Sequence, residues 1–170
     1  MTDKQEFPMP HQPMRASLPT LPFAQQQIIS QALAILEIQL RHRPYTLTSP
    51  EAVKAWLQLH LRPQGRECFM VLFLDNRHRL MASETVSVGT FNATTVYPRE
   101  VVIRALHHRC AAVVIAHNHP AGDPTPSQAD RTLTAQLVNA LNMVDIRVLD
   151  HLIIGESEPV SLAELGWLPC

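Results

Sequence analysis

Two uninterrupted apolar runs of strand length constrain the fold more than any other feature of the sequence. They are CFMVLFLD at residues 68–75 and AAVVIAH at residues 111–117. A strand without polar alternation is typical of a sheet that is covered on both faces. Each run is much shorter than a membrane span. We therefore expect a buried sheet with flanking helices, and no segment within a membrane.

The remaining pattern alternates between helical and extended segments. Residues 24–42 carry apolar side chains at helical spacing, and a second helix is expected from Ser49, as its N-cap, to about Leu61. Further strands are expected at 79–88, 146–155 and Val160. Residues 96–99 are expected to lead into a helix that ends at about His108, with Pro98 near its first turn. Another helix is expected after Thr125, where Pro126 and Gln128 fit a helix start. Such alternation predicts an α/β fold, a mixed β-sheet flanked by helices with an N-terminal helical extension.

The expected domain organisation has three parts. Residues 1–22 hold five of the prolines and no apolar periodicity, which predicts a flexible N-terminal segment. Residues 23–46 form the N-terminal helix and its connection, and residues 47–168 form one domain. No apolar stretch follows a basic start, so no signal peptide is expected.

Charge and cysteine content exclude several classes of protein. The formal net charge is −1 and only 17% of the residues are charged, which argues against a broad electrostatic grip on nucleic acid. The three cysteines lie far apart and form no C-x-x-C pair, so neither a disulfide framework nor a cysteine zinc site is expected. Reduced thiols fit a cytoplasmic protein.

The segment HNHPAGDPTPSQAD at residues 117–130 carries the chemistry. His117 and His119 are two residues apart at a strand end, so both imidazoles point to one face. Asp130 follows in the next helix, with Ser127 three residues before it on the same helical face. Two imidazoles and one carboxylate, with a fourth position left for water, is the arrangement of a catalytic zinc site. Asp123 is a weaker candidate ligand, because its Gly-Asp-Pro context is explained by a turn.

A zinc ion held there would lower the pKa of its bound water, which could then attack an amide carbonyl. A carboxylate is needed to move the proton to the leaving nitrogen, and Ser127 could donate a hydrogen bond to the oxyanion. Glu67 and Glu84 both interrupt apolar surroundings, and spacing alone does not decide between them.

The pattern His117-x-His119, seven residues, then Ser127-x-x-Asp130 resembles the JAMM motif of the JAB/MPN metalloprotease family. The chain is more specifically similar to the RadC-like branch of that family, through a longer series of matching segments. These are Glu67 followed by LFLD at 72–75, SVGT at 87–90, YPRE at 97–100, HNHPAGDPTPS at 117–127 and DHLIIG at 150–155. The resemblance covers about residues 47–168. It implies a cytidine-deaminase-like sandwich, zinc-dependent hydrolysis of a peptide or isopeptide-type bond, and Glu67 as the catalytic carboxylate.

Two other functions fit the same residues. Many RadC-like proteins carry an N-terminal helix-hairpin-helix region that binds DNA, and this chain is expected to be too short for a complete one. A binding module in a DNA-associated complex, which keeps the metal site, is therefore the alternative to a hydrolase. A scaffold domain without chemistry is disfavoured by the intact set of His117, His119 and Asp130. His151 is expected to be a hydrogen-bonded structural histidine. The sequence predicts neither the substrate nor the oligomeric state.

Overall fold

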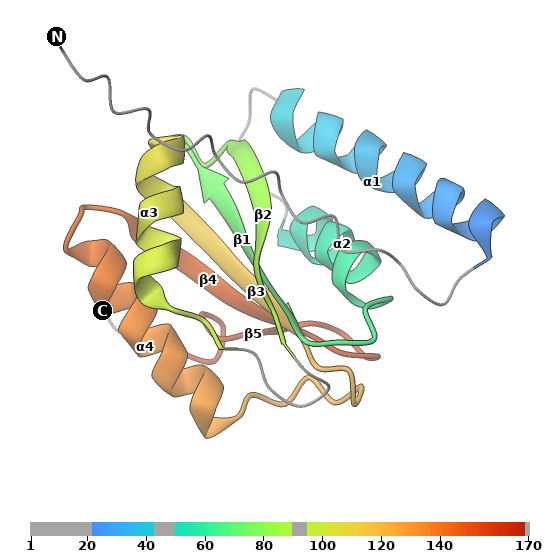
Figure 1. Cartoon of the computed structure of the whole chain (residues 1–170). Coiled ribbons are helices and arrows are strands. Elements are labelled where there is room, and N and C mark those ends of the chain that lie inside the picture. The colour runs from blue at the N-terminus through green and yellow to red at the C-terminus, as the bar shows by residue number, and fades with distance from the viewer. Residues whose placement is uncertain (1–21, 43–49, 90–94, 169–170) are drawn as a thin grey trace, which may run out of the picture.

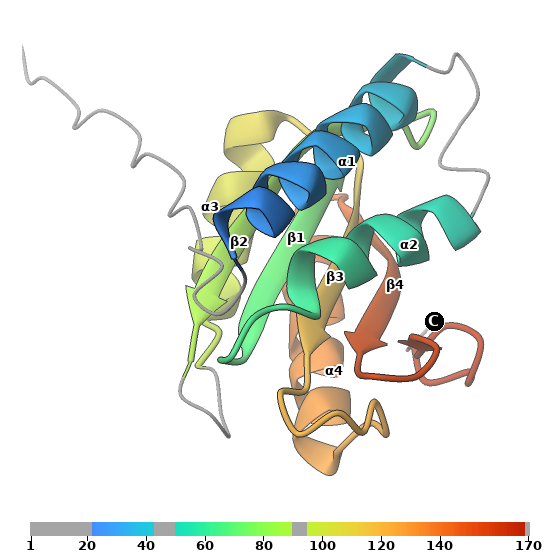
Figure 2. The ribbon, with the colours of Figure 1, turned by 90° about the vertical axis from the view of Figure 1, so that its right-hand side faces the viewer.

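The computed structural model describes residues 22–42, 50–89 and 95–168 of the chain. Its centre is a five-stranded sheet with strand order β2-β1-β3-β4-β5. Helices α1 and α2 lie on one face of this sheet, and α3 and α4 lie on the other (Figures 1 and 2). The predicted α/β architecture with a mixed sheet and flanking helices is confirmed.

The strands and helices follow the predicted order. The strands are β1 (Cys68–Leu74), β2 (Leu80–Val88), β3 (Ala112–Asn118), β4 (Arg147–Ile154) and β5 (Val160–Ser161). The helices are α1 (Phe23–His42), α2 (Pro50–Leu61), α3 (Pro98–His108) and α4 (Gln128–Asn142). The predicted flexible segment lies outside the described residues except for Pro22, and so does the predicted cap at Ser49. Within the described ranges, no helix combines the length and the apolar content that a membrane crossing requires.

The pairing of the strands determines where the sheet gathers its functional side chains. β1 is antiparallel to both β2 and β3, with Phe69 opposite His117, while β3 and β4 run parallel, with Ile115 opposite His151. A parallel pair needs a crossover connection, which α4 supplies. The ends of β3 and β4 and the beginning of β1 therefore meet at one edge of the sheet.

Two apolar layers hold the helices against the sheet. Every residue of β1 and β3 is buried, as the two apolar runs predict. Alternation divides the side chains of β1, so that Met70 and Leu72 pack toward α2 whereas Val71 and Phe73 pack toward α3 and α4. The helices contribute Val53, Trp56, Leu57 and Leu61 to the first layer, and Val101, Ala105, Leu137 and Leu141 to the second.

The start of α4 lies later than its sequence predicts. Its N-cap is Ser127, whose Oγ accepts a hydrogen bond from the Asp130 amide at 3.1 Å, while the Asp130 carboxylate accepts one from the Ser127 amide at 2.7 Å. The prediction that Thr125 is the N-cap was wrong, because Thr125 is hydrogen-bonded to Asp123 instead. The amide and the hydroxyl of Thr125 both donate to Asp123 Oδ1, at 2.9 and 2.6 Å. This bonding forms a turn before the helix.

Candidate metal centre

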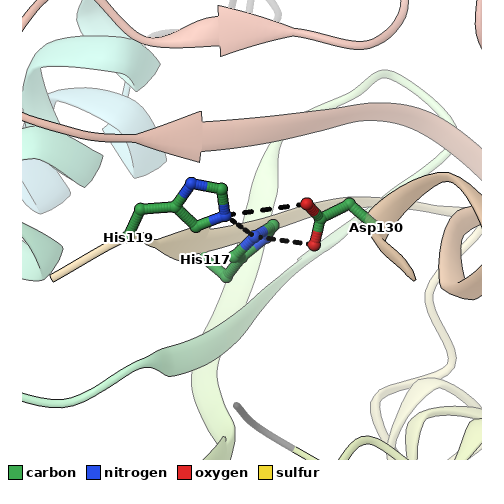
Figure 3. Close-up of side chains that lie close together, drawn as sticks. All are labelled: His117, His119 and Asp130. Atoms are coloured by element: carbon green, nitrogen blue, oxygen red, sulfur yellow. Dashed lines mark hydrogen bonds and ion pairs between the residues drawn. The ribbon is translucent and has the colours of Figure 1, made fainter. Parts of the chain in front are cut away.

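Three potential metal ligands meet beyond the edge where β3 ends and α4 begins (Figure 3). His117 is the penultimate residue of β3, and His119 directly follows that strand. Asp130 lies in the first turn of α4. The Nε2 atom of His117 lies 3.0 Å from His119 Nε2 and 3.1 Å from Asp130 Oδ1. His119 Nε2 lies 3.6 Å from Asp130 Oδ2. The sequence prediction that these side chains converge is thus confirmed.

The spacing and chemistry of these atoms fit a divalent cation. Ligands about 2.0–2.2 Å from a tetrahedral ion are separated from one another by about 3.4 Å, which is close to the observed separations. His117, His119 and Asp130 offer one ligand atom each, all within 4.8 Å of one another. Three electron-rich atoms brought this close repel one another unless a proton or a cation lies between them. Three protein ligands would leave one position of a four-coordinate ion to a ligand from solution.

A backbone carbonyl orients His119. Its Nδ1 lies 2.8 Å from the Asp123 carbonyl oxygen, which can only accept a hydrogen bond. In the neutral ring Nδ1 therefore carries the hydrogen, and the lone pair of Nε2 faces the space between the candidate ligands. The His119 amide in turn donates to the Ile154 carbonyl at 2.9 Å, which ties the loop to β4.

A close backbone approach keeps this loop in place. The Glu156 amide donates to the Gly122 carbonyl at 2.7 Å. A Cβ atom at Gly155 would lie 2.3 Å from that carbonyl oxygen and 2.8 Å from Pro124 Cδ. Only glycine at position 155 lets the loop approach β4 this closely without moving the backbone.

A buried histidine orients His117. The His117 ring is 1% exposed, and its Nδ1 lies 2.8 Å from Nε2 of His151, which is 0% exposed. Phe69 packs beside both rings, parallel to His117 at 6.1 Å between ring centroids and edge-on to His151 at 5.7 Å. The predicted role of His151 as a buried, hydrogen-bonded histidine is confirmed. Its direct contact with the candidate ligand His117 was not predicted from the sequence.

The electrostatics of the site favour a cation between its ligands. Burial raises the pKa of Asp130, but the contacts of its carboxylate with His117 and His119 outweigh it and hold that pKa well below its usual range. The hydrogen bond to Asp130 raises the pKa of His119. Burial, with a smaller effect from His117, lowers the pKa of His151 well below its usual range. His151 is thus a neutral ring, and the carboxylate is an anion that binds whichever cation occupies the site.

Glu67 lies beside this centre, one residue before β1. The Gly89 amide donates to the Glu67 carbonyl at 2.8 Å, so the pairing with β2 extends to this residue. Strand alternation puts Glu67 on the same face as Phe69 and His117. Its charge contributes to the raised pKa of His119, as expected of a neighbouring carboxylate.

Glu84, the other candidate carboxylate, is engaged elsewhere. Its two carboxylate oxygens bind Arg104 at 2.7 Å and His108 at 2.5 Å, both on α3. Glu84 therefore helps to hold α3 against β2.

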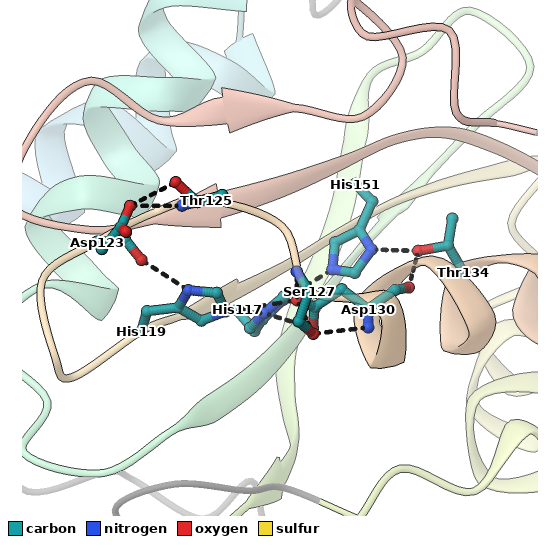
Figure 4. Close-up of polar contacts among 8 residues, drawn as sticks. All are labelled: His117, His119, Asp123, Thr125, Ser127, Asp130, Thr134 and His151. Carbon is teal, nitrogen blue, oxygen red and sulfur yellow. Dashed lines mark hydrogen bonds and ion pairs between the residues drawn. The ribbon is translucent and has the colours of Figure 1, made fainter.

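Ser127 and Asp123 have clear local roles. The Ser127 hydroxyl donates to Asp130 Oδ2 at 2.6 Å, which places it beside the candidate ligands while it also caps α4 (Figure 4). The Asp123 side chain is occupied by Thr125, in agreement with its interpretation as a turn residue. A catalytic role for Ser127 stays a prediction.

Asn118 lies between the two histidines in sequence and points to the opposite face of the sheet. Its Oδ1 accepts from the Cys68 amide at 2.8 Å, and its Nδ2 donates to the carbonyls of Gln64 and Arg66 at 3.2 and 3.0 Å. The side chain is 2% exposed. Asn118 thus ties the segment that carries Glu67 to the strand that carries the histidines.

Comparison with known proteins gives a family match over most of the chain. The sequence model of the RadC-like JAB domain matches residues 47–167. A UPF0758 protein of Vibrio campbellii is 52% identical over 144 residues, which cover 81% of this chain and 64% of that protein. The chain thus spans less than two thirds of the length of this relative.

Two relatives from Escherichia coli are matched over nearly their whole length. UPF0758 protein YkfG is 53% identical over 142 residues, covering 84% of this chain and 90% of YkfG. UPF0758 protein YfjY is 47% identical over 160 residues, covering 94% of this chain and all of YfjY. These names state no reaction, substrate or partner.

Proposed function

The chain belongs to the RadC-like JAB domain family, and from that premise we propose that it is a zinc-dependent hydrolase of amide bonds, of the peptide or isopeptide type. The observation that carries the proposal is the convergence of His117 Nε2, His119 Nε2 and an Asp130 carboxylate within 4.8 Å of one another. This donor set, with a position left for a further ligand, is typical of catalytic zinc sites.

The proposed mechanism assigns each residue one task. A zinc ion held by His117, His119 and Asp130 would activate water and polarise a substrate carbonyl. Glu67 takes the proton that the attacking water loses and delivers it to the leaving nitrogen. Ser127 turns its one hydroxyl hydrogen from Asp130 Oδ2 to the carbonyl oxygen as negative charge develops there. The proximity of Glu67 to His119 supports the first of these tasks for the carboxylate.

The decisive experiment combines metal content with turnover. We expect about one zinc ion per chain, and hydrolysis within a panel of peptides and of lysine side-chain amides. Glu67→Gln should keep the metal and lose about 10²–10⁴-fold in kcat, because it removes only the proton acceptor. Glu84→Gln is the matched control, since Glu84 binds Arg104 and His108 instead. A folded wild type that binds no divalent ion, or equal losses in both variants, would contradict the proposal.

Ser127 needs a variant that separates its two roles. Ser127→Ala removes the helix cap together with the hydroxyl, so a loss of activity would not identify the cause. Ser127→Asn keeps a side-chain acceptor for the amide of Asp130, because asparagine caps helices as well as serine does. If Ser127 stabilises the oxyanion, Ser127→Asn lowers kcat while the free energy of unfolding stays within about 0.5 kcal/mol of wild type.

The DNA-associated role and the cytoplasmic location remain separate proposals. Fluorescence anisotropy with single-stranded and branched DNA at low salt tests the former, because electrostatic binding is strongest there. DNA binding that survives Asp130→Asn would favour a binding module over a hydrolase. The cytoplasmic proposal rests on the reduced state of Cys68 and Cys110, which are both buried as free thiols.

A further inference from the structure

A chain of hydrogen bonds runs from His117 to the backbone of α4 (Figure 4). His117 Nδ1 lies 2.8 Å from His151 Nε2, and His151 Nδ1 lies 2.6 Å from the Thr134 hydroxyl. That hydroxyl donates to the carbonyl oxygen of Asp130 at 2.6 Å. This series of hydrogen bonds thus begins at one candidate ligand, His117, and ends at the backbone of another, Asp130.

The carbonyl at its end gives this chain a direction. A carbonyl oxygen only accepts, so the single hydrogen of the Thr134 hydroxyl is committed to Asp130. The hydroxyl oxygen must then accept from His151, so a hydrogen of that ring lies on Nδ1. His151 is 0% exposed, and burial disfavours the second hydrogen that would charge the ring. His151 Nε2 is left as an acceptor for His117 Nδ1–H. His117 therefore turns the lone pair of its Nε2 atom toward the space between His119 and Asp130, where a divalent cation would lie.

The reverse direction is disfavoured by burial. It would place the hydrogen of His151 on Nε2 and turn the lone pair of Nδ1 toward the Thr134 oxygen, whose hydrogen points away. Thr134 and His151 are both 0% exposed, so water does not repair such a contact. An unmade hydrogen bond at a buried polar group costs about 1–3 kcal/mol, enough to select one tautomer.

We propose that Thr134 and His151 are positioning residues that keep the hydrogen of His117 on Nδ1, so that its Nε2 atom stays available to a divalent cation. The part of this inference that concerns metal affinity rests on the function proposed above, whereas the position of the hydrogen does not. His119 obtains the same orientation directly from the carbonyl of Asp123. The two imidazoles thus present equivalent atoms by different means.

The fold explains why His117 uses two intermediates. The parallel pairing sets His151 of β4 opposite Ile115 of β3. Ile115 lies two residues before His117, on the same face of the sheet. Thr134 lies four residues after Asp130, so it occupies the same helical face one turn further into α4. Neighbouring strands and the helix that joins them therefore contribute one residue each.

The test replaces the hydroxyl without changing side-chain shape. Thr134→Val removes the acceptor of His151 Nδ1–H, and we expect zinc affinity, measured by competition with a chromophoric chelator, to fall about 10–100-fold. Thr134→Ser keeps the hydroxyl and should retain most of the affinity. Thr132→Val is the matched control: it removes the same kind of bond, to the carbonyl of Gln128, at an exposed position of the same helix. Its zinc affinity should equal that of wild type.

Nitrogen-15 NMR of the histidine side chains provides a readout that a purely structural role would not change. In metal-free wild type at mildly alkaline pH, His117 Nδ1 should carry the hydrogen, and Thr134→Val should shift that hydrogen toward Nε2. An unprotonated Nδ1 in the wild type overturns the inference, whether or not the valine variant folds. So does a folded Thr134→Val that keeps both the wild-type zinc affinity and the wild-type hydrogen position.

The two proposals fail in different ways. A wild type that binds no divalent ion refutes the proposed hydrolase, yet the hydrogen position on His117 is still measured in the metal-free protein. Zinc binding and turnover that are indifferent to Thr134→Val refute the positioning role and leave the hydrolase intact.

Discussion

Truncating Asn118 tests how strongly the sheet edge is held together behind the metal centre. Asn118→Ala removes three hydrogen bonds, to the amide of Cys68 and to the carbonyls of Gln64 and Arg66. Each contributes about 1 kcal/mol net, and a buried group left without a partner costs about 1–3 kcal/mol. Because the third contact is only partly buried, water restores part of the loss. We expect the free energy of unfolding to fall by about 3 kcal/mol.

Urea denaturation followed by circular dichroism measures this loss, provided that the slope with denaturant concentration stays the same. Asn139→Ala is the control, since Asn139 is exposed on α4 and its truncation should change stability by less than about 0.5 kcal/mol. Asn118→Asp should also destabilise, because it keeps the acceptor for Cys68 but sets a carboxylate against two carbonyl oxygens. A loss below about 1 kcal/mol for Asn118→Ala would refute the argument.

Three further predictions follow from other parts of the structure. Gly155→Ala should weaken zinc binding at least about 10-fold by moving the loop that carries His119. Gly65→Ala should not, because a Cβ atom added there meets no atom within 4 Å. Equal zinc affinities of the two variants would contradict this prediction. Burial raises the pKa of Glu84, but hydrogen bonds from His108 and Arg104 outweigh it and lower that pKa below its ordinary 4.5. The ion pair thus stabilises the fold above pH 4.5, and this stabilisation is lost as the pH falls through the lowered pKa. In thermal unfolding, Glu84→Gln should therefore destabilise the protein at pH 7 and progressively less below pH 4.5. A difference between variant and wild type that does not change with pH would be inconsistent with this account. Zinc at 100 times its dissociation constant should add about 2.7 kcal/mol of stability that a chelator removes, and Asp130→Asn should be insensitive to both.

The sequence was sufficient for the architecture because its signals are local. The apolar runs at 68–75 and 111–117 identify the two central strands, and they are buried along their whole length. The positions of His117, His119 and Asp130 follow from a strand end, a tight loop and a helix start that are contiguous in sequence. Their convergence could therefore be predicted without knowledge of the sheet order.

What the sequence did not predict depends on contacts between distant segments. The link between His117 and His151 spans 34 residues and requires the parallel pairing of β3 with β4, which no local pattern specifies. A histidine inside the apolar segment 146–155 was the available signal for that contact. The cap of α4 was misplaced at Thr125 for the opposite reason, since a competing contact with Asp123 lies only two residues away. Two local motifs overlap there, and propensity alone does not rank them.

Asp130 belongs at once to the candidate metal centre and to the capping box of α4. This overlap limits how the centre can be redesigned for another metal. Exchanging Asp130 for histidine or cysteine, to suit a softer ion, also takes away the carboxylate that accepts the amide hydrogen of Ser127. Selectivity engineering should therefore begin at His119, whose loop lies outside the regular elements and whose replacement leaves the start of the helix unchanged.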